Sequence, residues 1–531
     1  MTATFLSYGV ASRAMEASQA SINIVGNNIS NVNTEGYTRQ RVDIVSVTTS
    51  GMVEKYATPK VSTGIGAKAI RTTQLRDPYI DARFRTQNAE TSRYETMVKG
   101  LSNLEDVFDE ASTEALQGEL SSFVNDLQSL TQSPTSSDIA QVARSAAEKV
   151  TQVINMYATQ LEEVRTEQTE NLDIAVKSEF NTYVKNIASL NEQIQREEIY
   201  GNTPNELYDH RNLLIDKLSG VANIEVSMAP ADVISENLSI PHYTIKIKNQ
   251  SGGDDIVLVD NGKYSEMSLD AETDPLNVQL KIVDTTGVER TDVNSNVIDG
   301  SLRGYLNLIN GKGSFADTMA GESDSKGIFY YSTKMDIFAK QFATELNKIN
   351  SDITGPDGVP GSAGDLNLFT DSSGISAANI TAKNLQVSTA WLKNPSYIRT
   401  TRNPVIDPPP SADYKPTPAG ADNILRMIEK MSDKLDFKDS SGNKILTGTF
   451  NEYMTGVVSE VATDVELNTN FSKTATNVFQ TISDARDSVA GVSLNEEGVN
   501  LSAFQKVYNA AMRYFNVLDE NLDNIINKMG V

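Results

Sequence analysis

Few residues of this 531-residue chain are of the types that do chemistry in enzyme active sites. The chain holds two histidines, His210 and His242, and no cysteine. Neither histidine has a second His or Cys at the spacing that zinc ligation requires. A Ser-His-Asp triad stays open from sequence, although no G-x-S-x-G turn supports one. We therefore expect no catalytic residue, no metal ligand and no enzyme activity, and we interpret Asp209 to Arg211 as a helix surface that forms ion pairs.

Three glycine-containing stretches match ligand-binding loops only in part. "GIGAKA" (64–69) has Ala69 where the dinucleotide fingerprint has its third glycine, and a poor phosphate-binding helix follows. "NGKGS" (310–314) lacks the upstream glycine of a P-loop. "DFKDSSGNK" (436–444) lacks the spacing and the final Glu of an EF-hand. The first indicates a loop between short strands and the last a turn, so we predict no cofactor.

Composition narrows the classes of partner. The formal net charge is −24, from 46 Lys and Arg against 70 Asp and Glu, and no basic cluster offsets it. Nucleic acids and anionic membranes bind cationic faces, so we expect neither as a partner. No apolar run reaches the length of about 18 residues that a membrane helix needs. The N-terminus has no features of a cleaved signal peptide. A chain of this length is expected to form several domains.

Long stretches without helix breakers predict long helices. Residues 135–200 and 457–490 contain neither Gly nor Pro. Within the first stretch, apolar residues step by alternating fours and threes, the pattern of a helix packed on another helix. They are Val176, Phe180, Tyr183, Ile187, Leu190 and Ile194. Residues 334–349 form one more amphipathic pattern.

The middle of the chain has strand periodicity instead. Tyr243, Ile245 and Ile247 alternate with polar residues, as in a strand with one buried face. The pair Asn261-Gly262 suits a tight hairpin turn. Helical segments therefore flank a β-rich insert at 221–326. The fold class that we predict is mainly α with this insert, in several domains.

Both termini carry a seam of apolar residues, unbroken at the C-terminal end. At the C-terminal end the step is 3-4-3-4 over about four heptads, the spacing of a coiled coil. The positions are Leu501, Phe504, Tyr508, Ala511, Phe515, Leu518, Leu522, Ile525 and Met529. At the N-terminal end they are Tyr8, Ala11, Met15, Ser18, Ile22, Val25 and Ile29, with Ser18 the weak position. We expect the two helices to pair with each other or with neighbouring copies, rather than to form the core of a compact domain.

An asparagine-rich run, "NNISNVNTEGYTRQ" (27–40), follows the N-terminal seam. Asparagine caps helix ends and also donates and accepts toward a neighbour, and Gly36 permits the positive φ of a turn. The amide density indicates a polar seam between subunits beside the apolar one. The expected subunit-interface residues are Tyr8, Met15, Ile22, Val25, Asn27, Asn28, Ile29, Asn31, Asn33, Gly36, Tyr37, Arg39, Leu501, Phe504, Gln505, Tyr508, Ala511, Phe515, Leu518, Leu522, Ile525 and Met529.

The same run resembles a known family signature. "GNNISNVNTEGYTRQ" (26–40) is similar to the N-terminal signature of bacterial flagellar axial proteins, and its "GYTRQ" resembles the hook-associated protein 1 version. Segments 64–85 and 205–220 agree with that family too. The closing segment 491–529 matches it at Asn500, Leu501, Phe504, Gln505, Tyr508, Ala511, Asp519 and Leu522.

This resemblance implies a non-enzymatic subunit of the junction between flagellar hook and filament. Such proteins leave the cell by the flagellar type III export route and become part of the extracellular flagellum. The implied partners are neighbouring copies, the hook protein, hook-associated protein 3 and a cytoplasmic export chaperone on the C-terminal helix. The alternatives are a hook or distal rod protein, an extracellular enzyme domain on an axial-protein scaffold, and a cytoplasmic coiled-coil adaptor.

The predicted domains follow from these patterns. Residues 1–41 with 491–531 would pair as a terminal coiled coil, and residues 42–220 with 327–490 would form a helical-bundle middle domain. Residues 221–326 would form an outer β domain. A Pro-rich loop at 404–418 interrupts the middle domain.

Overall fold

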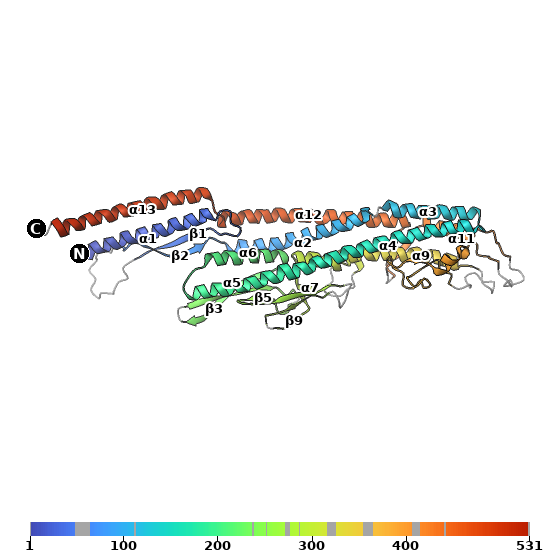
Figure 1. The fold of residues 1–531 in the computed structure, drawn as a ribbon, viewed down its shortest axis with the longest axis horizontal. Coiled ribbons are helices and arrows are strands. Elements are labelled where there is room, and N and C mark those ends of the chain that lie inside the picture. Colours follow the sequence, from blue (N-terminus) through green and yellow to red (C-terminus); the bar gives the residue numbers. More distant parts are fainter. Residues whose placement is uncertain are drawn as a thin grey trace.

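The chain forms an elongated rod with both termini at one end (Figure 1). The structure is a computed structural model that describes residues 2–47, 64–110, 113–235, 238–250, 252–270, 277–285, 287–315, 325–353, 365–405, 415–439 and 442–528. Helices dominate it, and its small sheets are antiparallel. The predicted class, mainly α with strands, is confirmed. None of the described helices combines the length and apolarity that a membrane crossing requires.

The first half of the chain is mostly helical. Its elements are α1 (Thr2–Ser30), β1 (Gln40–Ser46), β2 (Ala67–Gln74), α2 (Pro78–Glu110), α3 (Thr113–Gln132), α4 (Ser137–Ile174), η1 (Ala175–Phe180), α5 (Asn181–Ile199) and α6 (Asn205–Val221). Because η1 is a π-helical turn, α4 and α5 form one continuous helical stretch. This confirms the helix predicted at 135–200 from the absence of Gly and Pro.

Strands follow in the middle of the chain, and helices resume after them. The strands are β3 (Glu225–Ser235), β4 (Leu238–Ile247), β5 (Ile256–Asp260), β6 (Lys263–Tyr264), β7 (Glu266–Asp270), β8 (Gln279–Val283) and β9 (Glu289–Arg290). Then come α7 (Val293–Asn296), α8 (Ser301–Asn310), η2 (Gly313–Phe315), α9 (Ile328–Ser351), β10 (Phe369–Thr370), β11 (Gln386–Val387), α10 (Thr389–Lys393), η3 (Pro395–Tyr397) and α11 (Asp422–Ser432). The chain closes with β12 (Leu435–Lys438), β13 (Lys444–Gly448), α12 (Phe450–Ala490), α13 (Leu494–Asp523) and η4 (Asn524–Lys528).

The predicted β-rich insert is strand only in its first two thirds. Strands β3 to β9 occupy it, and Asn261 has a φ of +51° in the predicted hairpin turn between β5 and β6. Helix α8 also lies within the predicted range, and it packs on α2 because Gly100 leaves room for Leu308, whose Cδ2 would be 1.8 Å from a Cβ there. Nor do the strands form a core of their own. Ile245 and Leu280 share one core with Phe180 and Ile187 of the long helix.

A second, larger core fills the other end of the rod. It gathers side chains from α2, α3, α4, α9, α11 and α12. Phe338 on α9 packs edge-on against Phe450 at the start of α12, with ring centroids 5.5 Å apart. Thr449 and Glu452 form a capping box that begins α12 at this point. Much of the Pro-rich loop predicted at 404–418 lies outside the described residues.

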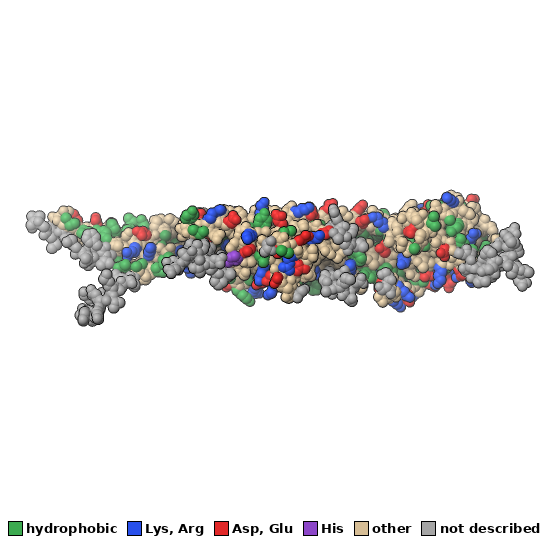
Figure 2. Space-filling view, turned by 90° about the horizontal axis from the view of Figure 1, so that it is seen from below, with side chains coloured by type: hydrophobic (Ala, Val, Ile, Leu, Met, Phe, Trp, Pro, Cys, Tyr) green, Lys and Arg blue, Asp and Glu red, His purple; other side chains and the backbone are tan. Residues whose placement is uncertain are grey.

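Helix α12 runs back along α2 toward the chain ends (Figure 1). A chain of buried ion pairs fastens it. Arg486 of α12 bonds Asp81 of α2 at 2.9 Å and Asp216 of α6 at 2.5 Å, and Asp216 also accepts from Arg85 at 2.9 Å. Burial alone would raise the pKa of Asp81, but the hydrogen bonds and charge of Arg76, with Arg486 and Arg85, hold that pKa below its usual value. The outer surface of this region carries charges of both signs (Figure 2).

Candidate assembly site at the chain ends

The N- and C-terminal helices lie side by side at one end of the rod (Figure 1). Helix α12 ends at Ala490, the backbone at Gly491 is extended, and the side chain of Ser493 caps the start of α13. This break lets α13 run beside α1 instead of continuing along α2. The hairpin of β1 and β2 packs against α1 as well. The assignment of residues 42–220 to the helical middle domain stays a prediction.

The two predicted apolar seams meet within one chain. The Tyr8 ring packs edge-on against Phe515, with centroids 4.9 Å apart, and the Tyr8 hydroxyl donates to Asp519 at 3.3 Å. Val25, Ala511 and Leu518 are buried. The prediction that the N- and C-terminal helices pair with each other is confirmed within a single chain. A coiled-coil geometry for the pair stays a prediction.

The remaining seam positions follow the same side of each helix. Half-buried positions are Met15, Ile22 and Ile29 on α1, and Leu501, Phe504, Tyr508 and Leu522 on α13, whereas Gln505 is exposed. Ile525 lies in η4, and its side chain is not described; Met529 lies outside the described residues. That these residues contact a neighbouring copy stays a prediction, since the α1–α13 pair already covers most of them.

The asparagine-rich run contains a buried amide that ties three segments together. The Asn28 side chain donates to the Gln40 carbonyl at 2.9 Å and to Glu497 at 3.3 Å. It accepts from the Gln40 N–H at 3.0 Å and from the Tyr37 hydroxyl at 2.9 Å. The bonding capacity of this amide is thus used inside the chain, where leaving it unpaired would be costly.

Arg39 completes the same network. Its Nε donates to Glu497 at 2.8 Å, its Nη1 donates to Glu496 at 2.7 Å, and its backbone N–H donates to the Ala490 carbonyl at 2.9 Å. Glu497 is 1% exposed and lies in the first turn of α13, where the helix dipole favours an anion. These contacts join the C-terminal end of α1 and the residues after it to the break between α12 and α13. We call the residues that make them the clasp: Asn28, Tyr37, Arg39, Gln40 and Glu497.

Tyr37 is a hydrogen-bond donor in the clasp at neutral pH. Burial, together with the charges of Asp209, Glu206 and Glu497, raises the pKa of Tyr37 to about 12. Gly36 beside it has a φ of +79°, which confirms the predicted turn, and its Cα faces Leu213. Gln40 and Glu497 are not among the interface residues predicted from the sequence, although an acidic pair behind a Ser cap is the pattern of a helix start.

The other asparagines of the run have different surroundings. Asn31 donates to the Asn27 carbonyl at 3.0 Å and so satisfies the end of α1. The side chains of Asn27 and Asn33 are exposed. If a polar seam to a neighbouring copy exists, these two are the amides of the run that remain available for it.

A second apolar line runs along α13 away from α1. Val499, Val507, Tyr514 and Val517 are 70%, 51%, 44% and 52% exposed. Their spacing of eight, seven and three residues keeps them on one side of the helix. We call these four residues the outer stripe. The sequence pattern predicts only one seam on this helix, whereas the exposed fractions distinguish a buried line from this exposed one.

Two side chains of the predicted ion-pairing surface at 209–211 are instead buried. Asp209 accepts from the Gln74 amide at 2.8 Å, and Arg211 donates to the Asn191 amide at 3.0 Å. Only His210 is exposed. The prediction was wrong because β2 covers Asp209, while α5 and the Tyr243 ring cover Arg211. His242 contacts Asp260 and Asn261 on the sheet.

Comparisons with known proteins identify the class. Residues 9–38 match the family model "Flagella basal body rod protein", and residues 101–365 match "Flagellar hook-associated protein FlgK helical domain". Together with paired terminal helices, these matches define an axial structural protein of the bacterial flagellum. Within that class, the chain belongs to the family of flagellar hook-associated protein 1.

Relatives agree over the whole chain. The chain is 28% identical to flagellar hook-associated protein 1 of Bacillus subtilis, over 100% of this chain and 99% of that protein. It is 23% identical to the Salmonella typhimurium protein of the same name, over 97% and 98%. The solved flagellar hook junction protein FlgK of Burkholderia pseudomallei covers 77% of this chain with its whole length, at a TM-score of 0.57 and 14% identity, which supports the fold.

Proposed function

We propose that this chain is the structural subunit that joins hook to filament in the bacterial flagellum. The family is a structural one rather than an enzyme family. The observation that supports the proposal best is the arm formed by α1 and α13, which the clasp holds at one end of the rod. A shape of this kind places both chain ends where neighbouring subunits can pack.

Neighbouring copies would pack through the outer stripe. The α1 seam is already occupied within the chain, whereas Val507, Tyr514 and Val517 leave apolar surface in water. Burial of such surface is worth roughly 25 cal/mol per Å². The exposed amides of Asn27 and Asn33 would add polar contacts. In this arrangement the α1–α13 pair acts as a coiled-coil unit and the stripe joins one unit to the next.

The further partners follow from the family. They are the hook protein on one side, hook-associated protein 3 on the other, and a cytoplasmic export chaperone that holds the C-terminal helix before assembly. The chain would leave the cell unfolded through the flagellar type III route. The absence of cysteine suits this route, because no disulfide can block threading.

The alternative of a hook or rod protein has narrower support. The rod family model matches residues 9–38 alone, whereas the hook-associated helical domain matches residues 101–365. The long helices α4 and α12 form part of the helical middle, and this helical middle favours the junction protein over a hook or rod protein.

The test is a pair of charge substitutions on the outer stripe. Val507→Asp with Val517→Asp should leave a folded monomer and abolish the attachment of filaments to hooks, seen by electron microscopy of cells that carry only the variant. Asn509→Asp, which is exposed on another side of α13, is the control and should attach filaments normally. Normal attachment by the double variant would refute the stripe as the assembly surface. Normal attachment in cells without any copy would refute the junction function itself.

A further inference from the structure

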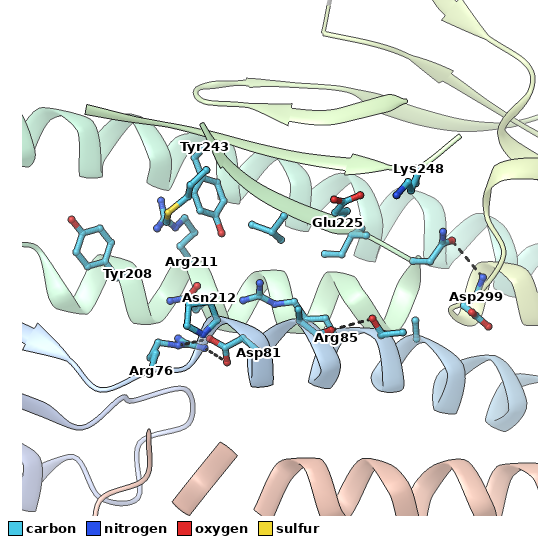
Figure 3. A pocket seen from close by; sticks show the side chains of 18 of the residues that line it. Arg76, Asp81, Arg85, Tyr208, Arg211, Asn212, Glu225, Tyr243, Lys248 and Asp299 are labelled. Atoms are coloured by element: carbon cyan, nitrogen blue, oxygen red, sulfur yellow. Dashed lines mark hydrogen bonds and ion pairs between the residues drawn. The ribbon is translucent and has the colours of Figure 1, made fainter. Parts of the chain in front are cut away.

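A cavity of about 820 Å³ lies between the helices and the neighbouring sheet (Figure 3). Helices α2 and α6 form one wall, and strands β3 and β4 form the other. Apolar side chains, including Ala89, Ile224 and Val226, line much of it. Its volume is within the range of small-molecule sites, about 300–1,000 Å³.

The arginines that line this cavity differ in whether a carboxylate neutralises their charge. Arg76 is paired with Asp81 at 3.0 Å, and Arg85 is paired with Asp216 at 2.9 Å. Arg211 is 6% exposed, yet within the described part of the chain no carboxylate lies within ion-pair distance of it. Its Nη1 donates to Asn191 at 3.0 Å, while its Nε has no hydrogen-bond partner among the described residues.

Two aromatic rings partly stabilise the buried charge of Arg211. The guanidinium carbon of Arg211 lies 4.0 Å from the ring centroid of Tyr243 and 5.4 Å from that of Tyr208. Figure 3 shows Tyr243 extending from the sheet toward the helices, beside Arg211. Burial lowers the pKa of Arg211 and raises that of Tyr243. A cation–π contact offsets only part of the cost of burying a charge, so an anion is still favoured there.

We propose that this cavity binds an amphipathic organic carboxylate. The carboxylate would accept charge-assisted hydrogen bonds from Arg211, and the apolar body of the ligand would lie against Ala89, Ile224 and Val226. Arg76 and Arg85 are already engaged in ion pairs, so Arg211 is the arginine of the wall that would hold the carboxylate. This binding activity is separate from the junction function, since the cavity includes no residue of the clasp or the outer stripe.

The test compares two probes that differ only in charge. Isothermal titration of the full chain with decanoate, below its critical micelle concentration, should show binding at least about tenfold tighter than with decanol, which has the same chain length. In Arg211→Gln the advantage of decanoate should disappear, because a charge-assisted hydrogen bond accounts for it. Arg83→Gln removes an exposed arginine of α2 that is not among the lining residues of the cavity, and this variant should behave as the unchanged chain.

A second variant covers the case in which Arg211→Gln does not fold. Ala82 is exposed at the cavity wall, so Ala82→Trp should keep the fold and weaken both probes by filling space. Retention of the decanoate preference by Arg211→Gln would overturn the proposal. So would equal affinity for the two probes, or no binding of either by the unchanged chain.

Discussion

Glu497 accepts a hydrogen bond from Arg39 at 2.8 Å, although the two residues are 458 positions apart in the chain. The Glu497 side chain is almost completely buried, and it also receives the Asn28 amide. One carboxylate thus holds the end of α1 and the start of α13 in one place. The position of the terminal arm relative to the rod depends on this contact.

Glu497→Gln should loosen the clasp. We expect a loss of about 1–3 kcal/mol in the free energy of unfolding, since a buried charge-assisted bond is replaced by a neutral one. Denaturant unfolding checks this loss. Glu496→Gln is the matched control, because its side chain is 62% exposed and a surface ion pair contributes about 0–1 kcal/mol. Equal losses in the two variants would contradict the assigned role of Glu497.

Neighbouring aromatic residues on α13 should have opposite roles. Phe515→Ala removes the ring that packs on Tyr8, so α13 should lose protection from hydrogen exchange in the monomer, with a cost of about 1–2 kcal/mol for a half-buried ring. Tyr514→Ala should change monomer stability by less than about 0.5 kcal/mol and weaken junction assembly instead. A large loss of monomer stability in Tyr514→Ala would show that the two faces have been assigned the wrong way round.

Acid should weaken the attachment of α12 to the rod through Asp81. Because its folded pKa is lowered, its contribution is complete above the unfolded value of about 4 and is lost as pH falls through the lower folded value. Asp81→Asn should therefore be less stable than the unchanged chain at pH 7 and show a smaller loss between pH 5 and pH 2. Thermal unfolding across that pH series measures both effects. Parallel curves for the two proteins would exclude this carboxylate as a source of acid lability.

Gly304→Ala should destabilise the crossing of α8 over α2. A Cβ at Gly304 would lie 2.9 Å from the Arg93 carbonyl and 2.7 Å from the Thr96 Cβ, so the helices must separate, at about 1–3 kcal/mol. Gly456→Ala on α12 meets nothing within 4 Å and should stabilise the chain by up to about 1 kcal/mol. A lower melting temperature for Gly304→Ala and a higher one for Gly456→Ala would support the close packing of α8 on α2. A gain in stability from both substitutions would contradict it.

Local patterns sufficed for the longest helix, for the strand at 243–247 and for the family. The absence of Gly and Pro from 135–200 predicts a helix because no residue there breaks one, and the structure has it. Alternation at Tyr243, Ile245 and Ile247 predicts a strand with one buried face, and these three are buried. The resemblance of 26–40 to flagellar axial proteins also needed only the sequence, since it rests on a contiguous run of residues.

Contacts between segments that are distant in the sequence could not be predicted from local patterns. A helix pattern shows which residues share a face and not what covers that face, so it predicts a surface at Asp209 and Arg211, which are buried. The packing of α8 on α2 depends on Gly100, some two hundred residues earlier, so no local pattern separates α8 from the β-rich insert.

The sequence by itself determined the long helices of runs 135–200 and 457–490, the apolar seams at both chain ends, and the family that the chain belongs to, because these depend on local spacing and residue type. Only the tertiary structure decided that the seams close on each other within one copy and that the outer stripe stays exposed. It also decided that Asn28, Arg39 and Glu497 converge at a break between α12 and α13. Convergence of residues more than four hundred positions apart is a property of packing, which no local pattern encodes.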